Sequence, residues 1–473
     1  MPKRIAIIGG GITGLSAAYY LQKELSKSNS DAEFVLYEAA DELGGKIKTS
    51  YRDGFISELG PDSFLARKKS MAELAKEVGL ENDLVHNSSG KSYILHNDTL
   101  YPMPGGAIMG IPTQWGPFLK TRLFSPAGKA RAAGDLFLPK VMKNGEDVSL
   151  GSFFRKRLGN EVVDKLIEPL LSGIYAGNID KLSLQATFPH FEQIEKKYGS
   201  MILGMKSSIA KQQEGKPKNR GKTKPKGMFL SFKGGLQSFV RAIEEQLDKS
   251  VVKKNAKLLQ IKKVDNRYRL LFEDGRDDVV DYMLITTPHH ITYQLLKDYS
   301  AVSYLGKMPA TSVATVVLAF PKSAIKKDID GSGFVVSKKS NYSITACTWT
   351  HKKWEHSTPE GYAQLRGYVG REGNEDIVFR SDEEIIHAVM KDLSAIMDIE
   401  GEPKFSTVTR WKEAMPQYEV GHRNNLNDVY VSMKKQLPGV YLTGGSFEGI
   451  GMPDCIDQGK KGVSNLLSEL GAN

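Results

Sequence analysis

A glycine pattern near the start of the chain limits what it can fold into more than any other feature. Gly9, Gly11 and Gly14 follow a short apolar run, Ile5–Ile8, and lead into Leu15–Lys27, which has helical periodicity. Glycines at this spacing permit a tight turn from strand to helix and let the backbone approach a pyrophosphate closely. The N-terminus of the helix adds free N–H groups and the positive end of its dipole. The segment therefore predicts a dinucleotide site at the start of a βαβ unit.

The second predicted strand, Phe34–Tyr37, ends at a carboxylate. Glu38 follows Gly14 by 24 residues, a spacing at which an acidic side chain accepts hydrogen bonds from ribose hydroxyl groups. The same carboxylate would repel a 2′-phosphate, which argues against NADP. A glycine-rich turn that binds nothing is the alternative interpretation of the pattern.

Composition and charge exclude several other classes of protein. The chain has 473 residues, 40% of them hydrophobic, which is enough for two or three domains with sizeable cores. It contains no run of about 18 apolar residues, so we expect no membrane-spanning helix. The net charge of +10 is concentrated in Lys206–Lys226, which holds eight basic residues and one acidic residue. Because this segment has no aromatic residue for base stacking, we expect a solvated basic loop and no nucleic-acid partner.

Few other residues suggest chemistry. Cys347 and Cys455 are the only cysteines and have no CxxC spacing, so we expect no disulfide framework, no cysteine zinc site and a reducing compartment such as the cytoplasm. The first residues lack the long apolar region of a secretory signal, and we expect no targeting segment. The adjacent His289 and His290 have no acidic or cysteine partner at ligand spacing, so no metal site is predicted. No catalytic acid, base or nucleophile can be assigned.

Further segments resemble a large family of flavoproteins that includes amine oxidases and phytoene desaturases. They are Leu43–Thr49, Glu58–Pro61, Ile285–Pro288 and Leu442–Gly445. The resemblance implies FAD as the cofactor and a final helix whose N-terminus points at the isoalloxazine ring. It also implies an α/β fold, with an FAD-binding Rossmann-like domain of the flavin amine oxidase type, a mixed-sheet substrate domain and a helical subdomain.

The expected domains are discontinuous in the sequence. The FAD-binding domain is predicted to comprise 1–75, 228–295 and 405–473, and the substrate-binding domain 76–100 and 296–404. A helical subdomain is predicted over 101–205 and a basic flexible loop over 206–227.

Longer segments are similar to the oxygen-dependent protoporphyrinogen and coproporphyrinogen oxidases of haem biosynthesis, above all to the Gram-positive bacterial form that acts on coproporphyrinogen III. These segments are Gly60–Leu65, Tyr101–Pro104, Gly110–Thr113, Glu168–Gly177 and Phe447–Ile456. The similarity implies an enzyme that oxidises coproporphyrinogen III to coproporphyrin III with O₂, removing six electrons and releasing three H₂O₂. It also implies at most peripheral membrane contact and a transient contact with the next enzyme of the pathway. A protoporphyrinogen IX oxidase, a flavin amine oxidase or desaturase, and a polyanion-binding scaffold with a vestigial dinucleotide fold remain alternatives.

The same resemblance implies a set of site residues. Gly9–Gly14 would hold the pyrophosphate, Glu38 the ribose and the backbone at Leu258 the adenine. The complete set of expected cofactor-binding residues is Gly9, Gly10, Gly11, Ile12, Thr13, Gly14, Glu38, Ala39, Lys46, Gly60, Pro61, Asp62, Ser63, Leu258, Trp411, Gly449, Ile450, Gly451 and Met452. The expected substrate-binding residues are Lys68, for a propionate, and Ile174 and Tyr368, which with Met452 would enclose the ring. Cys455 is interpreted as a small packed residue rather than as a point of covalent flavin attachment.

Overall fold

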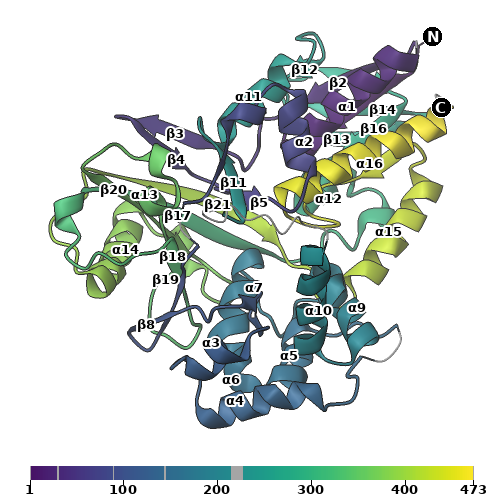
Figure 1. The fold of residues 1–473 in the computed structure, drawn as a ribbon. Helices are drawn as coiled ribbons and strands as arrows, with labels where there is room; N and C mark the ends of the chain where they lie inside the picture. Colours follow the sequence, from purple (N-terminus) through teal and green to yellow (C-terminus); the bar gives the residue numbers. More distant parts are fainter. Residues whose placement is uncertain (1, 29–30, 89, 143–144, 215–226, 472–473) are drawn as a thin grey trace. The chain divides into compact units, whose positions relative to one another are not determined.

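The structure is a computed structural model that describes residues 2–28, 31–88, 90–142, 145–214 and 227–471 (Figure 1). The chain forms two compact units, each made of segments that are distant in the sequence. The first unit comprises Met1–His86, Met228–Pro309 and Arg423–Asn473, and the second comprises Asn87–Gly227 and Ala310–His422.

The first unit is built on a parallel sheet with the strand order β12-β2-β1-β16-β22. Its strands are β1 (Arg4–Ile8), β2 (Glu33–Tyr37), β12 (Val252–Lys253), β16 (Tyr282–Ile285) and β22 (Val440–Leu442). Helix α1 (Ile12–Ser28) connects β1 to β2, and these two strands pair in parallel. The predicted βαβ unit is therefore confirmed.

Side chains of the parallel sheet pack on both of its faces, because successive residues of a strand point to opposite sides. Ile5 and Ile7 pack with helices on one face, and Ala6 and Ile8 pack with a second sheet and further helices on the other. The first group of helices is α1, α11 (Leu236–Glu245) and α16 (Met452–Leu470), and α1 and α16 lie side by side (Figure 1). The second layer contains β13 (Leu258–Val264), β14 (Arg267–Phe272), β15 (Asp277–Val280), α12 (His289–Leu296) and α15 (His422–Gln436). The parallel sheet thus lies between a helical layer and an antiparallel sheet.

Short elements complete the first unit. β3 and β4 form a hairpin, and β11 pairs with both β5 and β6. The bounds of these elements are β3 (Thr49–Arg52), β4 (Phe55–Glu58), β5 (Phe64–Leu65), β6 (Leu84–His86), β11 (Phe229–Phe232) and α2 (Ser70–Glu77).

The second unit combines a mixed sheet with a group of helices. The strand order is β21-β17-β20-β19-β18-β7-β8, in which β18 and β7 are parallel and the other neighbours antiparallel. The strands are β7 (Tyr93–His96), β8 (Thr99–Pro102), β17 (Ala310–Pro321), β18 (Gly333–Val336), β19 (Ile344–Trp349), β20 (Tyr362–Val369) and β21 (Phe405–Pro416). The main helices are α3 (Trp115–Lys120), α4 (Pro126–Ala133), α5 (Leu150–Leu158), α7 (Glu168–Tyr175), α8 (Leu184–Thr187), α9 (Pro189–Tyr198), α10 (Met201–Glu214) and α14 (Asp382–Met397).

The two units do not divide the chain where the expected domains do. The predicted FAD-binding domain resumes at residue 405, whereas the first unit resumes at Arg423. The difference arises because β21 pairs with β17 along most of its length and so belongs to the sheet of the second unit. As a division into functional domains, the predicted boundaries stay a prediction.

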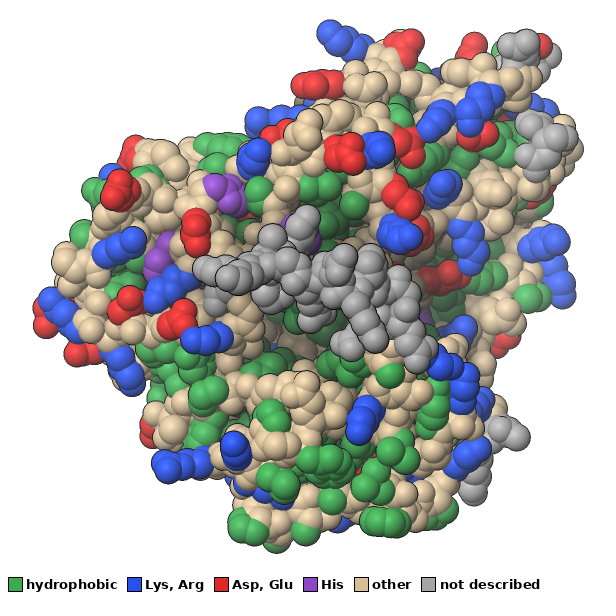
Figure 2. All heavy atoms as spheres, viewed as in Figure 1, with side chains coloured by type: hydrophobic (Ala, Val, Ile, Leu, Met, Phe, Trp, Pro, Cys, Tyr) green, Lys and Arg blue, Asp and Glu red, His purple; other side chains and the backbone are tan. Residues whose placement is uncertain are grey.

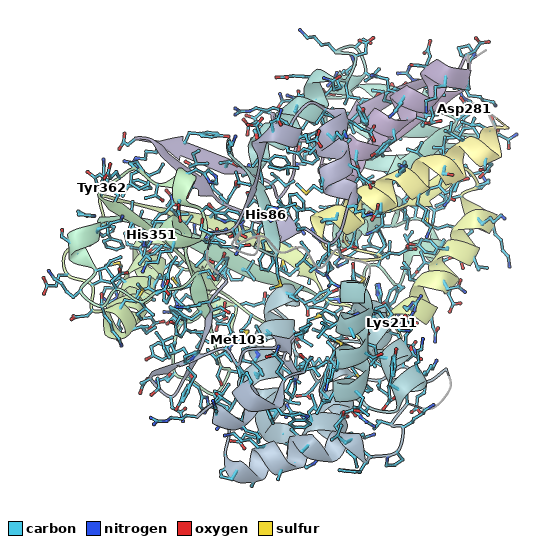
Figure 3. All side chains as sticks on the ribbon, viewed as in Figure 1. His86, Met103, Lys211, Asp281, His351 and Tyr362 are labelled. Atoms are coloured by element: carbon cyan, nitrogen blue, oxygen red, sulfur yellow. The ribbon has the colours of Figure 1, made fainter. Side chains whose placement is uncertain are left out.

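The predicted basic loop is wrong over its first residues. Helix α10 continues to Glu214, and Lys211 projects from it (Figure 3). Met201, Ile202 and Met205 are buried at helical spacing, and lysine is a good helix former on the opposite, solvated side. Residues 215–226, which hold most of the basic side chains of this segment, lie outside the described residues.

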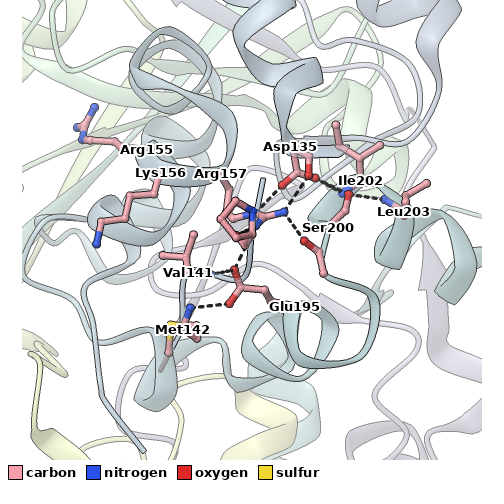
Figure 4. A network of polar contacts seen from close by, with 12 residues as sticks. Asp135, Val141, Met142, Arg155, Lys156, Arg157, Glu195, Ser200, Ile202 and Leu203 are labelled. Atoms are coloured by element: carbon pink, nitrogen blue, oxygen red, sulfur yellow. Dashed lines mark hydrogen bonds and ion pairs between the residues drawn. The ribbon is translucent and has the colours of Figure 1, made fainter. Parts of the chain in front are cut away.

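A buried arginine ties the helices of the second unit together (Figure 4). Arg157 is fully buried and donates from Nε to Asp135 Oδ1 at 2.6 Å and from Nη1 to Glu195 Oε1 at 3.4 Å. Its guanidinium also donates to the carbonyl oxygens of Pro139 and Gly199. Glu195 Oε1 also accepts from the Val141 N–H, and the other oxygens of the two carboxylates accept from Met142, Ser200 and Ile202. Each buried charge is therefore paired and hydrogen-bonded, which a buried charge requires.

We predict that Arg157→Met destabilises the second unit by about 3–5 kcal/mol, because it leaves two carboxylates buried without their cation. All four tryptophans, Trp115, Trp349, Trp354 and Trp411, lie in this unit. Their fluorescence during urea unfolding should show a transition at clearly lower urea. Arg155→Met is the matched control, since Arg155 is partly exposed and such pairs contribute about 0–1 kcal/mol. Equal urea midpoints for the two variants would contradict the prediction.

Candidate functional site

The phosphate-binding turn predicted from the glycine pattern lies where β1 passes into α1. Gly9 has a φ of +101°, a conformation that residues with a side chain rarely adopt. A Cβ on Gly14 would lie 1.9 Å from the Gly9 carbonyl oxygen, so glycine is required for α1 to pack on the strand. A Cβ on Gly11, by contrast, would meet nothing within 4 Å. Gly14 therefore serves packing, whereas Gly11 leaves open space in front of the turn.

Glu38 faces this turn from the end of β2. Its carboxylate accepts hydrogen bonds from the backbone N–H of Gly10 at 2.6 Å and of Ala40 at 2.8 Å. The backbone of Glu38 accepts from Ala256, and that of Ala40 from Asn255. Glu38, the adjacent Ala39 and the segment leading to β13, where Leu258 lies, are thus brought together as predicted for one end of a dinucleotide.

The segment Leu43–Lys46 packs directly against the phosphate-binding turn. Gly44 donates from its N–H to the Gly10 carbonyl oxygen at 2.9 Å, and Gly44 has a φ of +110°. Lys46 projects from this segment; its side chain keeps solvent-accessible surface, but protein atoms surround its ammonium closely. Desolvation by the surrounding protein lowers the pKa of the Lys46 ammonium, although its neighbour Cys455 acts in the opposite direction. An anion beside Lys46 would favour the charged form and act against this lowering, as a phosphate would.

Glu58 has a structural role that the sequence did not predict. Its carboxylate accepts from the Leu236 N–H at 2.6 Å and from the Thr49 hydroxyl at 2.8 Å. It therefore satisfies the N-terminus of α11 and fixes the hairpin that precedes residues 60–63. Within that segment Ser63 donates to Asp62 at 2.7 Å. The predicted contact of Gly60, Pro61, Asp62 and Ser63 with the cofactor stays a prediction.

The turn between β22 and α16 is braced by a residue that sequence analysis missed. Gln458 is buried, accepts from the Gly444 N–H at 3.0 Å and donates to the Gly449 carbonyl oxygen at 2.9 Å. Its amide group thus links Gly444 to Gly449, the first residue of the predicted flavin-binding turn Gly449–Met452. The sequence did contain one indication of this role for Gln458. It is a polar side chain on the face of the predicted helix that otherwise carries Cys455, Ile456 and Gly459.

Lys68, predicted to bind a substrate carboxylate, lies at the N-terminus of α16. Its ammonium is 2.5 Å from both carboxylate oxygens of Asp454, and each side chain is about one-third exposed, at 38% and 32%. The helix begins at Met452 after Gly451, which offers no side chain to cap the free N–H groups. Lys68 and the predicted flavin-binding turn are therefore neighbours in the first unit.

Three predicted site residues belong to the second unit. Trp411 lies on β21 opposite Val313, Tyr368 lies on β20, and Ile174 is exposed on α7. The Arg366 guanidinium lies 5.0 Å from the centroid of the Tyr368 ring. The roles of Trp411 at the cofactor, and of Tyr368 and Ile174 at the substrate, stay predictions.

Neither a metal centre nor a membrane-spanning helix is found in the part of the chain that the structure describes. No three His, Cys, Asp or Glu side chains among those residues are grouped closely enough to hold a metal ion. The His289 side chain is instead buried, and its Nε2 lies 2.9 Å from the Met308 carbonyl oxygen. None of the helices described is both long and apolar enough to cross a bilayer.

We predict that both cysteines of the native protein react slowly with iodoacetamide. Burial raises the pKa of the Cys455 thiol to about 11 and that of Cys347 to about 12. Since the thiolate is the nucleophile, alkylation of Cys455 at pH 8 should be at least about a hundredfold slower than for free cysteine, and faster as the pH rises toward 11. Mass spectrometry of peptides measures both rates, and urea-unfolded protein is the control. Labelling of native Cys455 at the rate of free cysteine would contradict the assignment.

Comparison with known proteins agrees with this geometry. Residues 12–467 match the family described as flavin containing amine oxidoreductase. The chain is 50% identical over 471 residues to a Bacillus subtilis protein named coproporphyrinogen III oxidase, covering 99% of this chain and 98% of that one. It is 44% identical over 472 residues to a Staphylococcus aureus protein of the same name, covering 99% and 100%. A solved structure from Exiguobacterium sp. 255-15 has a TM-score of 0.87 and 40% identity over 99% of both chains.

The fold class predicted from the sequence, α/β with a Rossmann-like domain of the flavin amine oxidase type, is confirmed by these comparisons. Together with the phosphate-binding turn, Glu38 and the β22–α16 turn, they show that the chain belongs to the flavin containing amine oxidoreductase family.

Proposed function

We propose that this chain oxidises coproporphyrinogen III to coproporphyrin III with O₂ in haem biosynthesis. Each turnover removes six electrons and six hydrogens from the macrocycle and reduces three O₂ to three H₂O₂. The observation that carries the proposal is 50% and 44% identity, along almost the whole chain, to two proteins named coproporphyrinogen III oxidase.

FAD is the flavin that the residues of the first unit fit. The open space at Gly11, the N-terminus of α1 and the carboxylate of Glu38 suit the pyrophosphate and ribose of a dinucleotide, which a flavin mononucleotide lacks. Bound FAD supplies a two-electron acceptor. The chain itself would contribute Lys46, whose ammonium would offset phosphate charge, and the Gly449–Met452 turn at the N-terminus of α16.

In the proposed reaction the protein orients the porphyrinogen and supplies no acid or base. Lys68 is proposed to attract a propionate of the macrocycle, and Ile174 and Tyr368 to contact its apolar ring. Because the ring is flat and apolar with charged groups at its rim, one cation and several apolar contacts orient it, and correct orientation accounts for much of the rate.

Peripheral contacts of the second unit form a further part of the proposal. Phe137 is 88% exposed and Leu119 58% exposed; Lys120 directly follows Leu119, and Lys140 lies three residues after Phe137. Figure 2 shows hydrophobic and Lys or Arg side chains close together over α3–α5. These features support a transient contact with the enzyme that receives the product, or with a membrane surface. A cytoplasmic location remains part of the proposal because both cysteines are unpaired.

We predict that Gly11→Val yields a folded protein that loses its flavin. The added side chain meets no protein atom near its Cβ but occupies the space proposed for the pyrophosphate. Flavin absorbance per protein after purification should fall at least about tenfold, equivalent to about 1.4 kcal/mol of binding free energy.

Two variants make this test specific. Gly116→Val also places a side chain in open space, but in the second unit, and should retain its flavin. Gly14→Ala should lower the unfolding temperature instead, because its Cβ would meet the Gly9 carbonyl oxygen. A stoichiometric flavin content in Gly11→Val would refute the placement of the pyrophosphate.

The substrate is tested by parallel oxidation of anaerobically prepared porphyrinogens, followed by porphyrin fluorescence. We expect coproporphyrinogen III to be oxidised with the higher kcat/KM, with three O₂ consumed per porphyrin formed. Protoporphyrinogen IX and a primary amine are the comparison substrates. A kcat/KM at least about tenfold higher for either one would reject the proposal in favour of that alternative.

A further inference from the structure

One ion pair at the N-terminus of α16 is not explained by substrate binding alone. Lys68 follows β5, whereas Asp454 lies in the first turn of α16, 386 residues later in the chain. The Lys68 ammonium is equally close, at 2.5 Å, to both oxygens of the Asp454 carboxylate. Asp454 was not among the predicted site residues.

Asp454 is fixed against the turn that is proposed to contact the flavin ring. A Cβ on Gly451 would lie 2.6 Å from Asp454 Oδ2 and 3.9 Å from Lys68 Nζ. A Cβ on Gly449 would lie 3.4 Å from Asp454 Cβ. The Gly449 carbonyl oxygen is in turn held by Gln458. The carboxylate thus lies over both glycines of the turn, and a side chain at residue 451 would displace it.

The charges at this turn oppose one another. The first N–H groups of α16 carry the positive end of the helix dipole, equivalent to roughly half an elementary charge. Asp454 places a full negative charge beside them, which would cancel the attraction of the helix for any anion at the turn. Lys68 neutralises that carboxylate and so restores the positive end of the helix.

We propose that Asp454 is a positioning residue that holds the Lys68 ammonium at the flavin-binding turn, and that pairing the two charges keeps either one alone from shifting the midpoint potential of the bound flavin. This inference rests on the proposed function, in which Gly449–Met452 contact the isoalloxazine ring. A ring that accepts two electrons gains negative charge, so a lone carboxylate nearby disfavours reduction and a lone ammonium favours it. Each side chain is about one-third exposed, and solvent therefore weakens the effect of either charge.

The test is a double-mutant cycle on the flavin-loaded protein, read by spectroelectrochemistry. Lys68→Met should make the midpoint potential more negative, and Asp454→Asn should make it more positive. Each single variant is expected to change the ratio of the affinities for reduced and oxidised flavin by about three- to tenfold. A tenfold change in that ratio shifts the midpoint potential of a two-electron couple by about 30 mV. The double variant should return close to the wild-type potential.

Two further variants separate this role from a structural one. Lys68→Arg keeps the charge and should keep the wild-type potential. Lys23→Met removes a lysine of comparable exposure from its 2.6 Å pair with Glu77, away from the turn, and should also leave the potential unchanged. Shifts of the same sign in Lys68→Met and Asp454→Asn, or no shift in either, would overturn the inference.

The outcomes also distinguish failure of this inference from failure of the proposed function. Wild-type protein that binds flavin and oxidises coproporphyrinogen III, with single variants that leave the potential unmoved, would overturn only the role of the ion pair. Wild-type protein that binds no flavin would overturn both.

Discussion

Close approach of backbone segments around the start of α1 is the constraint on which the first unit depends. A Cβ on Gly14 would lie 1.9 Å from the Gly9 carbonyl oxygen, and one on Gly459 would lie 2.6 Å from the Thr13 carbonyl oxygen. A Cβ on Gly444 would make a less close contact, 3.3 Å from the Thr13 hydroxyl oxygen. Strand β1, helix α1 and helix α16 can therefore come together only because side chains are missing at these positions. The phosphate-binding turn and the β22–α16 turn, from opposite ends of the chain, consequently lie side by side.

Buried polar side chains then hold the glycine-rich turns in shape. Gln458 links Gly444 to Gly449, and Glu58 accepts from the first N–H of α11, that of Leu236, beside the hairpin β3–β4. Backbone N–H and carbonyl groups buried without partners would cost free energy, and each of these side chains satisfies such groups. Hence Gln458 and Glu58 fix the backbone near the site. This fits a reaction in which the cofactor carries the chemistry and the protein supplies binding and orientation.

The parts that could be predicted from the sequence were those with local signals. The βαβ unit and Glu38 follow from strand, glycine and carboxylate spacing within forty residues of the start. Asp454 and Gln458 were not predicted, because their roles depend on which face of α16 meets a turn and on a partner as distant as Lys68. The basic segment was misjudged from its charge, although Met201–Met205 already supplied a buried helical face for α10. The pairing of β21, the strand of Trp411, with β17 is a non-local contact that no local pattern reveals, and the role of Trp411 at the cofactor stays a prediction.

Each charged side chain at the site is governed by its immediate neighbours, and the net charge of +10 says little about the site. Glu38 is held by two backbone N–H groups, Lys68 is neutralised by Asp454, and Lys46 is a cation whose pKa is lowered by desolvation. Of these, Lys46 gains most from a bound diphosphate, since an anion compensates the cost of keeping its charge among protein atoms. Lys68 gains less, because a carboxylate of the protein already compensates it. A substrate carboxylate would have to compete with Asp454 for this lysine. A contact with Lys68 would therefore add little to the affinity for the substrate and would serve mainly to orient and select it.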